Sequence, residues 1–163
     1  MRDDMRLRVA SLRERFFVVK DKMTEEITIS IAATNDAEAI AKLNLLFNEV
    51  DESADAIAAR MSDPNCVETV ILAKASSETV GFALVRVVPS VLYAAPHAEL
   101  TELYVLKEFR QQGIASGLIA FAEQIASQKG ARSILVQTGD DNLPALALYK
   151  KHGYEEYDLT LKK

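Results

Sequence analysis

A short glycine-containing turn between a strand-like run and a helix-like run constrains this chain more than any other stretch. Residues 98–105 (AELTELYV) are typical of a β-strand, and residues 116–129 are typical of an amphipathic helix. The turn between them has the sequence RQQGIA at residues 110–115. The first N–H groups of a helix have no partner inside it and lie at the positive end of its dipole. The turn therefore predicts a cradle for a phosphate group.

Two residues of this turn favour an anion. Gly113 permits a positive φ or a close approach of the backbone, and Ala115 is too small to block a bulky anion. The turn is not a P-loop, because no Gly-Lys-Ser/Thr follows, and it lacks the three-glycine spacing of a dinucleotide-binding turn. An ordinary connection between a strand and a helix is the alternative for this turn taken alone.

A second motif lies downstream, where residues 142–149 (NLPALALY) are followed by residues 150–154 (KKHGY). Together with the turn, it resembles the GNAT superfamily of acetyl-CoA-dependent N-acetyltransferases. The pattern of that family is a strand, Arg/Gln-x-x-Gly-x-Gly/Ala, a long helix, a strand, then Asn-x-x-Ala-x-x-x-Tyr and a Gly-aromatic pair. The chain matches this order and spacing from Glu99 to Tyr154. Upstream of Ala94 it resembles the family in the order of its elements only.

The resemblance implies that acetyl-CoA is the co-substrate and that three segments bind it. The strand end at Leu103, Tyr104 and Val105 would lie beside the pantetheine arm and the thioester carbonyl, with a backbone N–H as the oxyanion donor. Asn142 would contact pantetheine and also cap its helix. The pyrophosphate would be held, mainly by backbone amides, at Arg110, Gln111, Gln112, Gly113, Ile114, Ala115 and Ser116. A solvated surface arginine is the alternative for Arg110.

Two residues are implied to be catalytic. Tyr149 matches the tyrosine that protonates the leaving thiolate, a suitable acid since thiolate and phenolate basicities lie within about two units of each other. Its alternative is a buried tyrosine that packs and makes one hydrogen bond. Glu102 matches the position where several relatives place a general base, acting directly or through water. Its alternative is a glutamate that only binds the cation of the acceptor. Glu99 lies three residues earlier and is therefore predicted on the opposite face of the strand.

Composition and charge exclude several classes of function. The chain has 163 residues, which suit one domain, and its net charge of −5 argues against nucleic acid as a partner. An acidic charge can favour a cationic small substrate, and solubility alone is the alternative reason for it. Cys66 is the only cysteine and there are two histidines, so no internal disulfide and no zinc site can be built, and no metal is expected.

The apolar runs are too short to span a bilayer, and the first residues lack the features of a secretory signal. We therefore expect a cytoplasmic protein with no membrane partner. The expected partner is a small-molecule amine, and a homodimer is left open as the oligomeric state.

Hydrophobic periodicity predicts a mixed α/β fold, a GNAT-like sheet of six to seven strands flanked by about four helices. Residues 1–22 are interpreted as an N-terminal extension of unknown role with one strand-like stretch at 16–19, and residues 23–163 as a single N-acetyltransferase domain. The other expected strands are 27–31, 69–75, 79–88, 98–105, 133–138 and 154–161. Helices are expected from about 35 to 50, 53 to 61, 114 to 129 and 142 to 152. The first carries apolar residues at helical spacing, namely Ile40, Leu43, Leu46, Phe47 and Val50.

These observations predict an N-acetyltransferase that moves an acetyl group from acetyl-CoA to a primary amine of a small molecule. Polyamines, aminoglycosides and amino-acid-like compounds are the expected acceptors. One alternative is a non-catalytic acyl-CoA-binding or regulatory module on the same fold, which Tyr149 and Glu102 disfavour because a sensor needs neither. A protein or peptide N-acetyltransferase is the other alternative.

Overall fold

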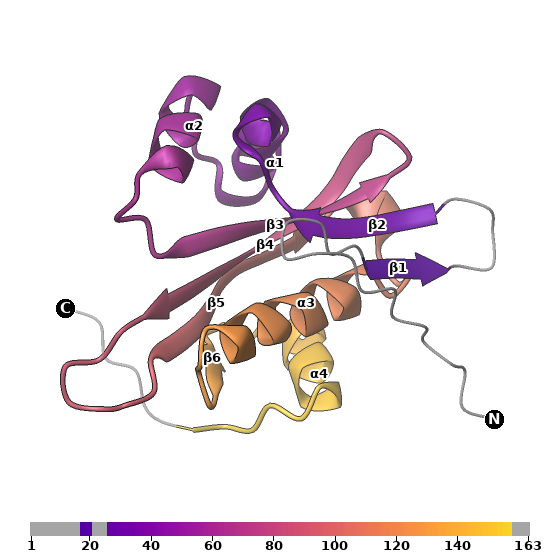
Figure 1. The fold of residues 1–163 in the computed structure, drawn as a ribbon. Helices are drawn as coiled ribbons and strands as arrows, with labels where there is room; N and C mark the ends of the chain where they lie inside the picture. The colour runs from indigo at the N-terminus through magenta and orange to yellow at the C-terminus, as the bar shows by residue number, and fades with distance from the viewer. Residues whose placement is uncertain (1–16, 21–25, 158–163) are drawn as a thin grey trace.

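A six-stranded sheet in the order β1-β2-β3-β4-β5-β6 forms the centre of the molecule (Figure 1). The computed structural model describes residues 17–20 and 26–157. Neighbouring strands are antiparallel except β5 and β6, which are parallel. The strands are β1 (Phe17–Lys20), β2 (Glu26–Ile31), β3 (Glu68–Ala75), β4 (Glu78–Val88), β5 (His97–Val105) and β6 (Ile134–Val136). The predicted mixed α/β fold is confirmed.

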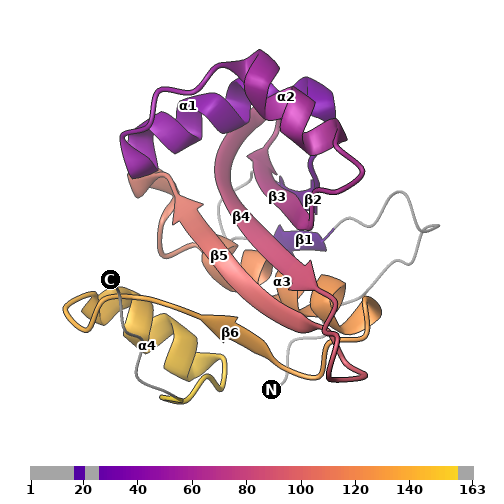
Figure 2. The same cartoon turned by 90° about the vertical axis from the view of Figure 1, so that its left-hand side faces the viewer.

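Helices cover both faces of this sheet (Figures 1 and 2). On one face lie α1 (Ala37–Asn48) and α2 (Ala54–Ser62), and on the other lie α3 (Ile114–Gln128) and α4 (Leu143–Lys151). Two single turns of 3-10 helix, η1 (Thr34–Asp36) and η2 (Lys107–Phe109), precede α1 and the turn before α3. None of the helices in the described part of the chain is long and apolar enough to cross a membrane.

The sheet has a hydrophobic core on each face. The larger core lies against α3, which buries Ile114, Leu118, Ala122 and Ile125 at helical spacing, as the sequence predicted. The smaller core lies under α1 and α2. The strand-like stretch of the N-terminal extension is β1, which pairs with β2 along one edge of the sheet.

Three predictions about the elements need correction. Helix α1 ends at Asn48, because Glu49 adopts a left-handed φ of 57° and closes it. Of the apolar residues predicted at helical spacing, Ile40 and Leu43 are buried, whereas Leu46, Phe47 and Val50 are 61%, 38% and 50% exposed. The strand predicted at 133–138 is shorter, since β6 spans Ile134–Val136. Residues 154–157 are irregular rather than a strand, and the remainder of that prediction lies outside the described residues.

A β-bulge in β5 corrects one further prediction. Leu100 lies opposite Val85 and Glu102 lies opposite Leu84, so Thr101 is an extra residue in β5. An extra residue shifts the alternation of side chains by one position. Glu102 consequently faces the α1–α2 side, which is also the side of Glu99. The prediction that the two glutamates point to opposite faces is wrong, because counting by twos fails across a bulge.

Candidate active site

The second half of β5 has an open edge. β6 pairs with β5 only at residues 98–100, where Ala98 lies beside Ile134 and Leu100 beside Val136. Beyond this point the two strands diverge (Figure 2). From residue 101 to 105, β5 is bordered by β4 on one side and, within the described residues, by no strand on the other. An unpaired strand edge presents N–H and C=O groups that a ligand can bind.

The register of β4 and β5 identifies the backbone groups on this edge. The N–H of Leu106 donates to the carbonyl of Val80 at 2.9 Å, so these two residues form a hydrogen-bonded pair. The next pair along the strands, Gly81 and Val105, is therefore a non-hydrogen-bonded pair, whose backbone N–H and C=O groups point away from each other. By alternation, Leu103 and Val105 both direct their N–H and C=O groups to the open edge. Their side chains pack against the larger core, so the edge offers a ligand backbone groups.

The turn before α3 presents a row of unpaired donors. Gln111 and Gly113 have positive φ values of 63° and 81°, and the first bond across the turn is that of the Gly117 N–H to the Gly113 carbonyl at 3.0 Å. Within the described residues, no acceptor contacts the backbone N–H groups of residues 111–116. Successive N–H groups around left-handed residues form a concavity that binds anions. The predicted phosphate cradle therefore has the donors it requires.

Arg110 connects this turn to the end of β5. Its Nε donates to the carbonyl oxygen of Val105 at 2.9 Å, and its Cζ lies 5.8 Å from the centroid of the Tyr104 ring. None of the carboxylates in the described part of the chain forms an ion pair with it. The positive charge of Arg110 is therefore uncompensated beside the unpaired N–H groups, and this charge favours an anion there.

Glu102 lies on the α1–α2 face of the sheet, between the open edge and the end of α1. Burial raises the pKa of its carboxyl, and the negative charge of Glu68 on β3 raises this pKa further, while the side-chain amide of Asn48 opposes the shift. A carboxylate with a raised pKa is a stronger base than an ordinary glutamate. The position and electrostatics of Glu102 suit both the base and the cation-binding role predicted for it.

Two further glutamates, Glu68 and Glu99, lie on this sheet face. Glu68 accepts a 3.5 Å hydrogen bond from the hydroxyl of Thr101, the bulged residue. Glu99 is bonded to Arg86 of β4, so its charge is neutralised. Glu68 and Glu102 remain as carboxylates that form no direct ion pair with the described residues.

Tyr149 lies on α4 in the larger core and is 8% exposed. Its ring is 5.6 Å from that of Tyr154, and burial raises the pKa of its hydroxyl, which keeps it protonated. Within the described residues, its hydroxyl has no hydrogen-bond partner. The phenol therefore keeps its proton and gives it to none of the described residues.

Asn142 caps α4, since its Oδ1 accepts a 3.4 Å hydrogen bond from the N–H of Ala145. The capping role predicted for Asn142 is confirmed, and its contact with pantetheine stays a prediction. Within the described residues, no group of three or more His, Cys, Asp or Glu side chains is arranged to hold a metal ion.

Sequence reasoning missed three residues of this region: Asn48, Glu68 and Arg86. They come from α1, β3 and β4, and none belongs to a local motif. The pairing of β3 with β4 and of β4 with β5 brings Glu68 and Arg86 to the face that carries Glu102. Only a known strand register could have identified Glu68 and Arg86, and Asn48 approaches Glu102 from a helix.

Comparisons with known proteins identify the family of the chain. The Acetyltransferase (GNAT) family matches residues 34–154. The chain is 34% identical over 136 residues to the aminoalkylphosphonate N-acetyltransferase of Salmonella typhimurium (strain LT2), covering 81% of this chain and 87% of the relative. It is 29% identical over 137 residues to the uncharacterized N-acetyltransferase YhfO of Bacillus subtilis (strain 168), covering 80% and 91%.

A solved structure of the aminoglycoside N-acetyltransferase AAC(6')-Iy in complex with CoA has the same fold. It superposes with a TM-score of 0.74 at 21% identity, over 88% of this chain and 97% of that chain. The family match covers the open edge of β5, the donor-rich turn, Glu102 and Tyr149. The chain therefore belongs to the GNAT family and is an acetyltransferase.

Proposed function

We propose that the protein transfers an acetyl group from acetyl-CoA to a primary amine of a small molecule. The observation that carries this proposal is the position of the open β5 edge, which leads at its end to a turn with unpaired N–H groups. An elongated ligand with a pyrophosphate at one end fits this arrangement of an edge and an anion cradle. Acetyl-CoA supplies the activated acetyl group as a thioester.

The backbone of the chain performs most of the binding. The N–H groups of residues 111–116 bind the pyrophosphate, aided by the charge of Arg110. The N–H groups of Leu103 and Val105 and the carbonyl of Leu103 bind the pantetheine arm. One of these N–H groups stabilises the negative charge that develops on the thioester carbonyl oxygen during transfer. Asn142 completes the pantetheine contacts from the start of α4.

Glu102 and Tyr149 accept and donate the protons that move during the reaction. An amine attacks only in its neutral form, so the proton of the ammonium group must leave, and Glu102 accepts it directly or through water. The raised pKa of Glu102 makes this transfer easier. Tyr149 donates its hydroxyl proton to the leaving thiolate, because its buried phenol is neutral at physiological pH.

The charges on the α1–α2 face of the sheet, here called the acceptor face, favour a cationic acceptor. Glu68 and Glu102 form no direct ion pair within the described residues, whereas Glu99 is paired with Arg86. Two carboxylates on one face attract an amine that carries more than one positive charge. Among the acceptors expected from sequence, polyamines and aminoglycosides fit this face better than amino-acid-like compounds. An amino-acid-like compound also carries a carboxylate, which Glu68 and Glu102 repel.

Titration calorimetry with CoA tests the cofactor site. Gly113→Glu places a side chain at a φ of 81° and a negative charge in the cradle, so we expect CoA affinity to fall by at least about 10²-fold. Gly130→Glu is a matched control. It introduces the same side chain at a φ of 90° just beyond the other end of α3, and it should bind CoA as the wild type does. Equal affinities for folded Gly113→Glu and Gly130→Glu would refute the cradle.

A further inference from the structure

We infer that Arg110 is a positioning residue that couples the cofactor site to the acceptor site through the aromatic ring of Tyr104. The inference rests on the proposed function, since it takes the turn as the CoA site and the α1–α2 face as the acceptor site. It differs from the role predicted for Arg110 in the sequence, where the guanidinium is only a phosphate contact.

The first half of the connection lies between the turn and β5. The Arg110 side chain uses Nε to bind the Val105 carbonyl at 2.9 Å. This carbonyl is the last one on the open edge, so the guanidinium occupies the acceptor at the end of that edge. The two terminal nitrogens of the same group have no partner within the described residues, and they are free to bind a phosphate oxygen. One planar group can therefore contact the strand and an anion at the same time.

The second half crosses to the other face of the sheet. The guanidinium lies over Tyr104, whose ring stacks on Phe47 with centroids 4.9 Å apart and an interplanar angle of 29°. Phe82 contacts both rings, at 6.0 Å from Phe47 and 6.2 Å from Tyr104. Phe47 is in the last turn of α1, and Figure 2 shows this end of α1 close to the end of β5.

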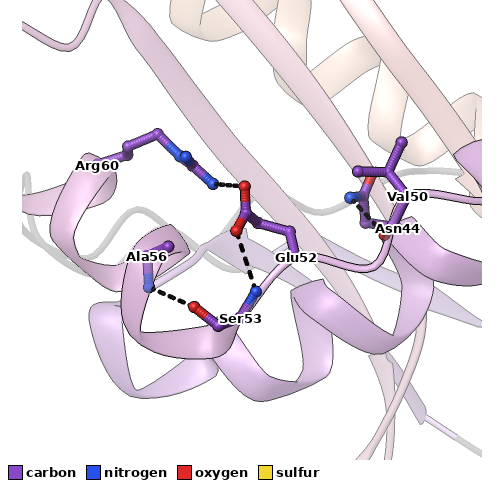
Figure 3. A network of polar contacts seen from close by, with 6 residues as sticks. All are labelled: Asn44, Val50, Glu52, Ser53, Ala56 and Arg60. Atoms are coloured by element: carbon purple, nitrogen blue, oxygen red, sulfur yellow. Dashed lines mark hydrogen bonds and ion pairs between the residues drawn. The ribbon is translucent and has the colours of Figure 1, made fainter.

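The end of α1 carries the amide that influences the proposed base. Asn48 follows Phe47 and is the residue whose side chain opposes the raised pKa of Glu102. The segment after α1 is held by its own polar contacts (Figure 3). Asn44 donates to the Val50 carbonyl at 3.3 Å, and Glu52 pairs with Arg60 of α2 at 2.7 Å. Phe47 and Asn48 are consecutive residues in the last turn of α1, so a shift of Phe47 also moves Asn48.

The physical consequence is a free-energy coupling between the two ligands. A phosphate bound at the turn draws the guanidinium toward it, and this movement changes the contact of Arg110 with Tyr104. The ring stack passes the change to α1, so bound CoA favours one position of Phe47 and Asn48 beside Glu102. Lysine keeps the charge of Arg110 but lacks the planar fork that can bind a carbonyl, a ring and a phosphate together.

A tryptophan reporter tests this inference without an acceptor, because the chain contains no tryptophan. Phe47→Trp keeps an aromatic ring on Tyr104, and its emission should shift when CoA is added. In Phe47→Trp combined with Arg110→Lys, calorimetry should show CoA affinity within about 10-fold of the parent, while the emission shift is lost. The control is Leu92→Trp, at a residue that is 85% exposed in the β4–β5 loop, and its emission should not change.

Three outcomes would overturn the inference. One is an unchanged emission of Phe47→Trp when calorimetry shows that CoA is saturating. Another is an equal emission shift in the reporter with and without the Arg110→Lys substitution. The third is an emission shift of Leu92→Trp on addition of CoA that is as large as the shift of Phe47→Trp. Absence of CoA binding to the wild type would refute the proposed function as well, so the two failures are distinguishable.

A second measurement avoids the reporter if Phe47→Trp does not fold. The dissociation constant of CoA is measured with and without a saturating polyamine, spermidine, in the wild type and in Arg110→Lys. The wild type should show a ratio of about 5-fold or more, the scale of typical coupling between sites. Arg110→Lys should give a ratio near one. Equal ratios in both proteins, including a ratio of one in the wild type, would overturn the inference.

Discussion

At the scale of single residues, the hydroxyl of Tyr149 has the most specific of the proposed roles. Tyr149→Phe removes the hydroxyl and keeps the ring in its core position, where it is 8% exposed. If the hydroxyl protonates the leaving thiolate, kcat should fall by roughly 10²-fold or more while the affinity for CoA changes little. Steady-state kinetics and CoA titration measure the two effects. A near-wild-type kcat, with chemistry shown to limit the rate, would remove Tyr149 from the mechanism.

The second residue-scale prediction concerns the pH dependence of Glu102→Gln. A base must be deprotonated, and the pKa of Glu102 is raised, so wild-type activity should rise with pH through this pKa. The deficit in kcat of Glu102→Gln should shrink as pH rises, because a larger fraction of the amine is then already neutral. If Glu102 only binds a cation, KM for the amine should rise and kcat should remain largely intact. Initial rates from about pH 6 to about pH 10, the range in which these groups titrate, separate the two roles.

Thermal unfolding gives an independent check on the cause of the pKa shift. A folded-state pKa above the unfolded value means that the folded protein binds the proton more tightly. Ionised Glu102 therefore lowers the free energy of unfolding above its unfolded pKa of about 4.3. Glu102→Gln should be more stable than the wild type at neutral pH, and this advantage should vanish at acidic pH. A destabilised variant at neutral pH would contradict burial as the dominant cause.

At the scale of elements, the bulge in β5 is the feature on which the site depends. Deletion of Thr101 removes the extra residue but leaves Leu100 and Leu103 on the α3 face, so the core is preserved. We expect a folded protein whose β5 runs straight alongside β6, with kcat/KM lowered by about 10²-fold through misplacement of the edge. Deletion of Leu92 in the exposed β4–β5 loop is the control. A folded Thr101 deletion with wild-type turnover would show that the bulge is not required.

The elements also show what a sequence can and cannot predict. The spacing of Ile114, Leu118, Ala122 and Ile125 predicted α3 and its buried face, because one helical period governs the whole segment. The same reasoning gave the wrong end for α1. Apolar residues of this helix lie on more than one of its sides near that end, and Glu49 ends the helix by its left-handed conformation. The turn before α3 could be located from sequence because it is local, while its role as a phosphate cradle stays a prediction.

The acceptor face was not predictable in the same way. Which side chains of β5 point to this face depends on the bulge at Thr101. A bulge cannot be recognised reliably in a sequence when the strand pairing is unknown. Glu68 and Arg86 join it through the registers of β3 with β4 and of β4 with β5. The bond of Arg110 to the Val105 carbonyl spans only five residues, but it depends on the path of the intervening turn, whereas a sequence motif alone presents Arg110 as a phosphate ligand.

At the scale of the whole molecule, one sheet separates the two tasks of an acetyltransferase. In the proposed mechanism, the α3 side supplies the cradle for CoA and the phenol of Tyr149, and the α1–α2 side presents Glu102 and Glu68 to the acceptor. The diverging edge of β5 is the place where the two sides meet. The net charge of −5 agrees with a cationic small-molecule acceptor, because the acidic groups include those on the acceptor face.

The release of CoA thiol from acetyl-CoA in the presence of a panel of amines tests the central claim most directly. The panel contains polyamines, aminoglycosides, amino acids and an aminoalkylphosphonate, each assayed with wild type, Tyr149→Phe and Gly113→Glu. We predict turnover of at least one polycationic amine by the wild type, with acetylated product found by mass spectrometry and a loss of about 10²-fold in both variants. Saturable CoA binding without acetylation of any amine, or equal turnover by wild type and Gly113→Glu, would contradict the account.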